Sequence, residues 1–374
     1  MTESGSGNKV FVMMSGGVDS SVAAAVLQEQ GYEVIGVFMK CWSIEQLESL
    51  GAEKSLYGCF WEEDVEDARL VAGRLNIPFY VWDFEKEYKN GVVDYMLREY
   101  ASGRTPNPDV MCNSTIKFGI FYQRAMELGA DFVATGHYAK RQDLVDFANY
   151  YLKDNNETGI GRGKDANKDQ SYFLWRLPAQ VVSKTLFPIG EFETKQAVRL
   201  KAESLNLITA AKKDSQGLCF IGETPLRDLL LQTLGSKQGQ ILDMHGKVLG
   251  QHPGAYLYTV GQRTGLGLSG GPWFVVETDI TQNLVKVAHQ SEESYLFKSE
   301  LQVSDLNWLV NLPSSSFKAQ AQIRYRQKAV DCKVEIKPNN SADIVFDEPV
   351  RAVSKGQSIV FYDNELMLGG GVIN

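Results

Sequence analysis

The sequence is poor in cysteine and has no long hydrophobic run. Its five cysteines form an odd, widely spaced set without a Cys-x-x-Cys pair, which argues against a disulfide scaffold and against a standard zinc ribbon. No stretch approaches the roughly 18 apolar residues of a membrane helix. The segment from Met1 to Asn8 has the features of neither a signal peptide nor a transit peptide. We therefore expect a cytoplasmic protein with no membrane partner and no structural metal.

Acidic residues outnumber basic ones, 46 to 38. The formal net charge is −8 at pH 7, which weighs against indiscriminate binding of nucleic acids. A local basic patch can coexist with an acidic total, so a structured RNA partner stays open. The 374 residues are 44% hydrophobic and 22% charged, which is ordinary for a globular protein, and the length predicts two or three domains.

The most informative motif is a glycine-rich turn at the end of an apolar strand. Residues 10–14 run directly into Ser15-Gly-Gly-Val-Asp-Ser20, and a helix is predicted from Ser21. Such glycines let the backbone approach an anion, and the helix N-terminus supplies free N–H groups. Neither the Walker consensus nor the dinucleotide-binding pattern is present. The turn resembles the PP-loop of ATP pyrophosphatases, with an ordinary strand-to-helix turn as the alternative.

The first half of the chain alternates apolar strands with amphipathic helices. This alternation, from Lys9 to about Leu205, predicts a Rossmann-like parallel sheet covered by helices. The predicted strands are 10–14, 34–39, 79–83 and 132–135, and the clearest helices run from Ser21 to Gly31 and over 65–75. We interpret Cys41–Phe60 as a loop or short helical insertion over the site.

The remainder of the chain has a residue pattern that is typical of β structure. A hairpin is predicted over 239–250 with its turn at His245-Gly246, and a glycine-rich run follows at 261–271. From about Glu300 the residues alternate, and the pattern repeats from Val330 to Ile336. One face carries Ala319, Ala321, Ile323 and Tyr325, and the polar face carries Gln320, Gln322, Arg324 and Arg326. We expect an α/β PP-loop domain at 8–221, a small central domain at 222–289 and a C-terminal β-barrel at 290–374.

Two cysteines stand where a thiol could react. A helix predicted to start near Asn113 would place Cys112 at its N-terminus, where the dipole lowers a thiol pKa, with Asp109 nearby as a general base. Cys219 follows Lys212, Lys213 and a polar stretch, which also favours thiolate. The alternatives are a small apolar Cys112 beside a capping aspartate, and a buried Cys219 opening a strand at 218–221. The other three, Cys41, Cys59 and Cys332, are expected to be structural.

Two further segments carry polar residues next to strands or aromatic pairs. Gly136 could admit a nucleotide close to the backbone, and His137 could act as an acid, a base or an RNA contact. Lys168 and Gln170 could touch phosphates or base edges, with Tyr172 stacking on a base. A histidine in this position is more often structural, and a capped helix with core aromatics explains the second segment equally well.

Taken together, these segments resemble the tRNA-specific 2-thiouridylases of the MnmA/TrmU family. The most specific feature is the Asn107-Pro-Asp segment with Cys112, followed much later by Cys219. The stretch Cys41–Phe60 departs from the family's shorter patterns. The matching stretches, which follow the family's order along nearly the whole chain, are 14–20, 38–40, 104–109 with Cys112-Asn113, 134–138, 168–173, 214–222, 259–263, 324–327, 346–349 and 368–371.

The resemblance implies ATP and Mg²⁺ as cofactors and a two-step chemistry. The carbonyl oxygen at C2 of the wobble uridine attacks the α-phosphate, and Cys219 then supplies sulfur as a persulfide. Cys112 either resolves the persulfide through a transient Cys112–Cys219 disulfide or attacks the carbon first, with Asp109 as the general base. The residues implied to bind ATP are Met13, Met14, Ser15, Gly16, Gly17, Val18, Asp19 and Ser20 at the phosphates, with Met39 and Gly136 at the adenosine.

The resemblance also implies two macromolecular partners for a chain expected to be a monomer. One is tRNA, whose anticodon-loop uridine must be flipped out to reach the site. The other is a persulfide donor, either a cysteine desulfurase or a relay protein. The residues implied to contact tRNA are Asn107, Pro108 and Asp109 at the target base, and His137, Lys168, Asp169, Gln170, Arg324, Tyr325 and Gln357 elsewhere.

Two other functions fit parts of the sequence. A PP-loop synthetase that adenylates a small metabolite would use ammonia and need no thiols, but no glutaminase domain is visible. A nucleotide-binding regulatory module would need no catalytic groups, and the presence of Asp19, Asp109, Cys112 and Cys219 speaks against it. The sequence therefore favours the thiouridylase.

Overall fold

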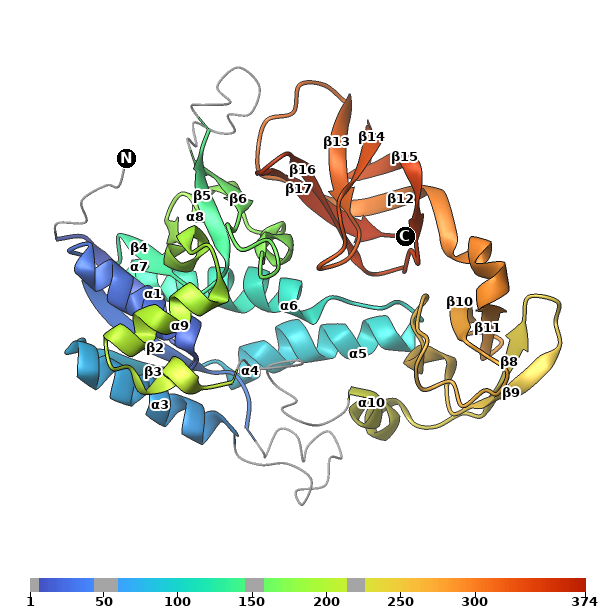
Figure 1. Ribbon diagram of the computed structural model, residues 1–374, viewed down its shortest axis with the longest axis horizontal. Coiled ribbons are helices and arrows are strands. Elements are labelled where there is room, and N and C mark those ends of the chain that lie inside the picture. Colours follow the sequence, from blue (N-terminus) through green and yellow to red (C-terminus); the bar gives the residue numbers. More distant parts are fainter. Residues whose placement is uncertain (1–6, 44–59, 145–157, 214–225) are drawn as a thin grey trace.

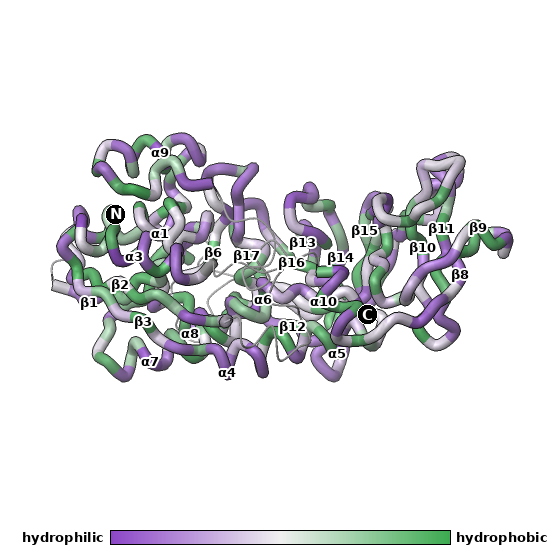
Figure 2. Tube along the Cα trace, turned by 90° about the horizontal axis from the view of Figure 1, so that it is seen from below, coloured by the Kyte–Doolittle hydropathy of each residue, from purple (hydrophilic) through white to green (hydrophobic). Residues whose placement is uncertain are grey.

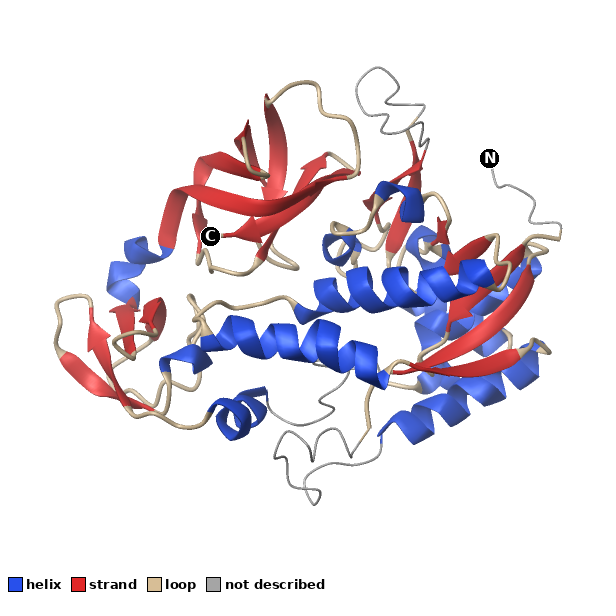
Figure 3. Ribbon diagram, turned by 180° about the vertical axis from the view of Figure 1, so that it is seen from behind, coloured by secondary structure: helices blue, strands red, loops and turns tan. Residues whose placement is uncertain are grey.

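A computed structural model describes residues 7–43, 60–144, 158–213 and 226–374 and consists of three packed units (Figure 1). A helix-covered parallel sheet lies at one end, a small β unit lies at the other, and a barrel of strands lies above the helices that connect them. Figure 3 shows that most helices belong to the first unit and most strands to the other two. The predicted fold class, with a parallel α/β sheet, a small central domain and a C-terminal β-barrel, is confirmed.

The parallel sheet is built on β1, its central strand. Its strand order is β3-β2-β1-β4-β7, with every pairing parallel. All four predicted strands agree with the observed bounds to within one residue at each end, and the prediction for Phe79–Asp83 is exact. The strands are β1 (Lys9–Met13), β2 (Glu33–Lys40), β3 (Phe79–Asp83), β4 (Phe132–Ala134) and β7 (Thr185–Leu186).

Alternate side chains of β1 enter two different hydrophobic cores. Val10 and Val12 pack under α1 (Val18–Glu29), α3 (Phe60–Leu75) and α9 (Lys195–Ser204). Phe11 and Met13 pack on the opposite face against the remaining long helices. Figure 2 shows β1 and β2 as hydrophobic stretches inside this unit. The sheet is therefore buried on both faces, which explains the continuous apolar run in the sequence.

Two long helices with π-helical centres cover the second face. One runs through α4 (Glu85–Tyr88), η2 (Lys89–Val93) and α5 (Asp94–Ala101). The other runs through α6 (Pro108–Met111), η3 (Cys112–Phe121) and α7 (Tyr122–Glu127). Smaller helices are η5 (Ser171–Leu174), α8 (Ala179–Val182), η6 (Pro188–Glu191) and η7 (Ile208–Ala211). No helix within the described ranges is long and apolar enough to cross a membrane.

The C-terminal unit is a closed barrel that shares its sheet with the first unit. Its strands run in the order β12-β15-β14-β13-β16-β17, and β17 pairs back with β12. The hairpin of β5 (Ala139–Asp143) and β6 (Thr158–Arg162) extends this sheet from β17. The barrel strands are β12 (Phe297–Trp308), β13 (Ser316–Gln322), β14 (Val330–Lys337), β15 (Ser341–Arg351), β16 (Ser358–Asp363) and β17 (Leu366–Ile373).

One predicted strand pattern in the barrel is wrong. The alternation expected through Tyr325 and Arg326 ends where β13 ends, at Gln322, and Arg326 has a positive φ of 64°. Arg324 and Arg326 therefore do not share a strand face. Gln322, expected on the polar face, is buried instead. Its polar atoms are satisfied there, because its side chain accepts a hydrogen bond from Arg162 and donates one to the carbonyl of residue 324.

The central unit is a four-stranded sheet of order β10-β11-β8-β9. The predicted hairpin is confirmed, with Gly246 at a positive φ in its turn. Its strands are β8 (Gly239–Asp243), β9 (Val248–His252), β10 (Trp273–Asp279) and β11 (Leu284–His289). The helices α10 (Leu226–Leu234), η8 (Ala255–Leu257) and η9 (Gln290–Leu296) accompany them.

Candidate active site

The glycine-rich turn joins β1 to α1 and leaves the helix N-terminus without a side-chain cap. Gly16 has a φ of 72°, and a Cβ on it would lie 2.2 Å from the Asp64 carbonyl oxygen of α3, so only glycine fits there. The backbone N–H of Ser15 donates to Ser20 Oγ at 3.1 Å, which braces the turn. Gly17 is the N-cap of α1 and provides no side-chain hydrogen bond. The first N–H groups of α1 therefore suit an anion such as a phosphate.

Gly136 packs directly on this turn from the loop after β4. A Cβ at position 136 would lie 2.7 Å from the Ser20 nitrogen and 2.8 Å from the Asp19 carbonyl carbon. The sequence predicted a close approach between Gly136 and a nucleotide. The close approach observed here is to the backbone of the turn itself, so Gly136 fixes the position of Asp19 and Ser20.

Asp19, in the first turn of α1, is held by two side chains, Tyr138 and Lys195, that no sequence pattern marks as functional. Tyr138 Oη donates to Asp19 Oδ1 at 2.7 Å. Lys195 Nζ lies 2.8 Å from Asp19 Oδ1 and 2.7 Å from Oδ2. Tyr138 was adjacent to the predicted Gly136-His137 pair, but Lys195 is separated from Asp19 by 176 residues. No local pattern could have connected Lys195 with the turn.

A second lysine is tied to α3 close to the same turn. Lys212 Nζ contacts Asp64 Oδ1 at 2.7 Å and also pairs with Asp67. Lys212, predicted as a cationic neighbour of Cys219, has its charge offset by these two carboxylates. Cys219 itself, with the strand predicted at 218–221, lies outside the described residues.

The helix that carries Cys112 begins earlier than predicted. Asn107 caps α6 by accepting a hydrogen bond from the Val110 N–H at 3.2 Å, and Pro108 occupies the first helical turn. An asparagine cap followed by proline is a strong helix start, so the predicted start near Asn113 is wrong. Cys112 lies one turn inside the helix, is 4% exposed, and opens the π-helical segment η3. Such segments are frequent at functional sites.

Asp109 and His137 have shifted pKa values, and Lys117 influences both. Burial raises the pKa of Asp109, while the nearby Lys117 charge opposes the rise. Burial and the same Lys117 charge hold the pKa of His137 well below its usual range. His137 is therefore neutral at pH 7, with Nδ1 2.8 Å from Thr135 Oγ1. The raised pKa makes Asp109 a stronger proton acceptor than an exposed aspartate.

We expect Asp109→Asn to lower the activity and to leave the folded protein at least as stable as the parent. Loss of the general base predicted at Asp109 should reduce turnover by about 10²- to 10⁴-fold. Because the folded-state pKa is raised, the folded protein binds more protons than the unfolded chain, and its stability falls as pH rises through that window. The amide removes this penalty. Denaturant unfolding at neutral pH should therefore show Asp109→Asn at least as stable as the parent, with the difference vanishing below about pH 3.9. A destabilised variant at neutral pH would contradict the role of burial.

Comparison with known proteins decides the family. Residues 8–223 match the family model of the tRNA methyl transferase HUP domain, 227–289 that of the tRNA methyl transferase PRC-barrel domain, and 298–373 that of the aminomethyltransferase beta-barrel domain. The chain is 46% identical over 369 residues to the tRNA-specific 2-thiouridylase MnmA 2 of Geobacillus kaustophilus, covering 98% of this chain and 94% of that protein. The chain belongs to the MnmA family of tRNA-specific 2-thiouridylases.

Two further relatives also match this chain over nearly their full length. The tRNA-specific 2-thiouridylase MnmA of Francisella philomiragia is 42% identical over 373 residues, covering 98% of this chain and 99% of that protein. The MnmA of Streptococcus mutans is 44% identical over 374 residues, covering 98% and 95%. The similarity to the MnmA family thus includes the α/β unit, the central unit and the barrel.

In this MnmA family member, the loop before α6 is fixed by both other units. The N–H of Thr105 donates to the Lys355 carbonyl at 2.8 Å, and Gln357 Nε2 donates to the carbonyls of Thr105 and Pro106 at 2.9 and 3.0 Å. Thr105 Oγ1 lies 3.2 Å from Thr259 Oγ1 of the central unit. The barrel and the central unit therefore position the segment that leads to Asn107, Pro108 and Asp109.

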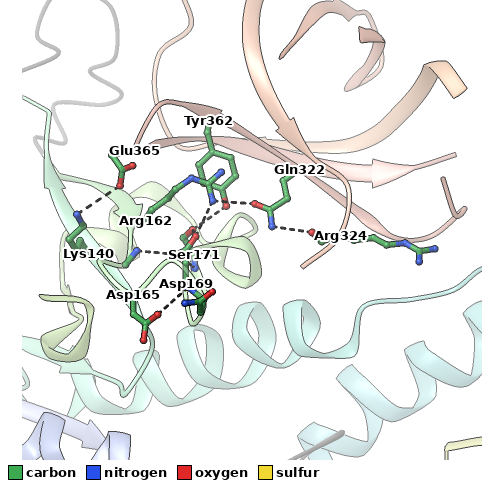
Figure 4. Close-up of polar contacts among 11 residues, drawn as sticks. Lys140, Arg162, Asp165, Asp169, Ser171, Gln322, Arg324, Tyr362 and Glu365 are labelled. Carbon is green, nitrogen blue, oxygen red and sulfur yellow. Dashed lines mark hydrogen bonds and ion pairs between the residues drawn. The ribbon is translucent and has the colours of Figure 1, made fainter. Parts of the chain in front are cut away.

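The predicted tRNA-binding stretch at 168–170 is built into the junction with the barrel (Figure 4). Asp169 is 9% exposed and accepts hydrogen bonds from the backbone of Gly163 and Ser171 and from Arg162 Nη1. The Arg162 guanidinium also lies 3.6 Å above the Tyr362 ring of the barrel. Asp169 therefore orders the junction, and its contact with tRNA stays a prediction.

The other predicted tRNA contacts also hydrogen-bond or pack within the protein. Gln170 Oε1 accepts from the Tyr138 N–H at 3.0 Å, which ties this stretch to the residue that holds Asp19. Arg324 Nη2 donates to the Val260 carbonyl at 2.7 Å and to Ser354 Oγ at 2.8 Å. The ring of Tyr325 packs 4.6 Å from that of Phe173. These residues thus connect the three units, and their contact with tRNA stays a prediction.

Proposed function

We propose that this protein replaces the oxygen at C2 of the tRNA wobble uridine with sulfur, at the cost of ATP. The observation that supports this most strongly is the 42–46% identity to tRNA-specific 2-thiouridylases over 98% of the chain. The PP-loop turn and the Asp109–Cys112 helix supply groups for both halves of such a reaction. The domain limits 8–221, 222–289 and 290–374 belong to the same proposal.

The first half-reaction activates the uridine. The C2 oxygen forms a bond to the α-phosphorus of ATP, the bond from that phosphorus to the bridging oxygen breaks, and pyrophosphate leaves with the electron pair. The uncapped N-terminus of α1 and the turn at 15–20 would bind the phosphates. Met13, Met14 and Val18 belong to the same strand–turn–helix, and Met39 and Gly136 would border the adenosine.

Mg²⁺ would neutralise charge on the phosphates of the bound nucleotide. Within the described ranges, no cluster of three or more His, Cys, Asp or Glu side chains could hold a metal ion alone. Mg²⁺ is usually held by one or two carboxylates together with substrate phosphates, and Asp19 at the first turn of α1 fits that donor set. Asp19 is therefore the carboxylate that we assign to it.

The second half-reaction transfers sulfur. Cys219 carries a persulfide received from a donor protein, and the Cys112 thiolate attacks its inner sulfur, which forms a Cys112–Cys219 disulfide and releases hydrosulfide. The hydrosulfide attacks C2, and the C2–O bond breaks as AMP leaves. The Asp109 carboxylate takes up a proton in this step, and an external thiol reduces the disulfide before the next cycle. Direct attack of Cys112 on C2 is the alternative order.

Nucleoside mass spectrometry tests this function. Unmodified tRNA is incubated with the protein, ATP, Mg²⁺ and a cysteine desulfurase that generates persulfide. We expect 2-thiouridine at the wobble position, and none without ATP or with Cys219→Ala. Pyrophosphate release with a small-molecule acceptor but no thiouridine would instead support a PP-loop synthetase.

A further inference from the structure

The PP-loop of this chain contains no lysine, but the fold brings one to it. In a Walker loop, a lysine within the motif reaches the β- and γ-phosphates. Here Lys195, the first residue of α9, places its ammonium against both carboxylate oxygens of Asp19 at 2.7–2.8 Å. We propose that Lys195 is a nucleotide-binding residue, which exchanges Asp19 for the β- and γ-phosphates when ATP and Mg²⁺ bind. This inference rests on the proposed function for its nucleotide.

The position of Lys195 is fixed from several directions. Its backbone N–H donates to Asp165 Oδ2 at 2.9 Å, and Thr194 caps α9 by accepting from the Ala197 N–H at 3.2 Å. Its ammonium also lies 5.7 Å from the centre of the Tyr138 ring. A lysine anchored at its backbone, with its charged end beside the phosphate-binding turn, needs only a side-chain movement to change its anionic partner.

Electrostatics supplies the reason for the exchange. The side chain of Lys195 is 14% exposed and that of Asp19 is 31% exposed, so the ammonium is largely removed from water and requires an anion nearby. Once Mg²⁺ binds the Asp19 carboxylate, the phosphates offer the Lys195 ammonium a negative charge in its place. A cation at this place also stabilises the charge that develops on the departing pyrophosphate.

The same helix provides a matched control. Lys201 also belongs to α9 and also pairs with a carboxylate of α1, but its partner is Glu29, at the opposite end of α1, at 2.7 Å. The two ion pairs join the same two helices and differ in their distance from the turn. A purely structural role of Lys195 in holding α9 to α1 would make Lys195→Ala and Lys201→Ala behave alike.

Calorimetric titration with ATP and with AMP tests the proposal without tRNA or sulfur. We expect Lys195→Ala to weaken ATP binding by about 10- to 100-fold, the range for a charge-assisted hydrogen bond. AMP lacks the β- and γ-phosphates, so its affinity should be unchanged. The ATP effect should be largest with Mg²⁺ present and smaller in EDTA, where no metal competes with Lys195 for Asp19. Lys195→Arg should restore part of the affinity, and Lys201→Ala should bind both nucleotides as the parent does.

An unchanged ratio of ATP to AMP affinity in Lys195→Ala would overturn the proposal. An equal loss of affinity for ATP and for AMP would show that Lys195 stabilises the turn instead of contacting the phosphates. The binding result is independent of thiouridine formation: a chain that makes no thiouridine but loses ATP selectivity in Lys195→Ala would refute the proposed function and keep this inference.

Discussion

Gly136→Ala is expected to abolish detectable ATP binding. The new Cβ would lie 2.7 Å from the Ser20 nitrogen and 2.8 Å from the Asp19 carbonyl carbon, distances that require a backbone to move. Either the loop after β4 withdraws or the turn and the first residues of α1 are displaced, and displacement removes the N–H groups from the phosphate. Overpacking of this kind also costs about 1–3 kcal/mol of stability. Calorimetric nucleotide titration and denaturant unfolding measure the two effects.

The control for this substitution is Gly73→Ala. Gly73 lies within α3, and a Cβ there would meet no atom within 4 Å. A glycine-to-alanine change in a helix with free space stabilises by about 0.5–1 kcal/mol, so this variant should bind ATP normally and unfold at a slightly higher denaturant concentration. Normal ATP binding by Gly136→Ala would show that the turn does not depend on this contact.

Cys112→Ser is expected to stop thiouridine formation while leaving adenylation intact. A hydroxyl cannot attack the persulfide at a useful rate, so we expect a loss of about 10³-fold or more, the scale seen when a catalytic nucleophile is removed. Pyrophosphate release dependent on tRNA should continue, because the first half-reaction uses only the PP-loop and the uridine. Quenched reactions analysed for pyrophosphate and for 2-thiouridine separate the two half-reactions.

Cys332→Ser is the matched cysteine variant for this experiment. Cys332 lies in the barrel strand β14, 2% exposed, and burial raises its pKa to about 12. A thiol with that pKa stays protonated at neutral pH and is a poor nucleophile. Cys332→Ser should retain both half-reactions, apart from a modest loss of stability. Equal thiouridine yields from Cys112→Ser and the parent would exclude Cys112 from sulfur transfer.

The sheet was predictable because its pattern is local. The run from Val10 to Met14 is apolar on both faces, and the structure uses both, with Val10 and Val12 in one core and Phe11 and Met13 in the other. The glycine-rich turn follows the central strand, so strand, turn and helix could be placed from consecutive residues. The β13 strand of the barrel was predictable for the same reason up to Gln322, where the strand ends and the alternation no longer describes the backbone. The alternation from Val330 to Ile336 was also predictable and lies in β14.

The contacts that complete the candidate site were not predictable in the same way. Lys195 reaches Asp19 only because α9 packs along α1, a consequence of the tertiary fold. Gln357 reaches Thr105 across 252 residues for a similar reason. The start of α6 is a different case, because the Asn107-Pro108 cap that begins the helix is a local signal present in the sequence. Local capping decided that boundary.

The step that defines the proposed reaction is the bond from the C2 oxygen of uridine to the α-phosphorus of ATP. It is tested by tRNA whose wobble uridine carries oxygen-18 at C2, with the AMP product analysed by mass spectrometry after thiolation. Because sulfur displaces the oxygen together with AMP, the heavy oxygen is predicted in AMP. Unlabelled AMP accompanied by 2-thiouridine would contradict adenylation at C2 and require another route for the sulfur.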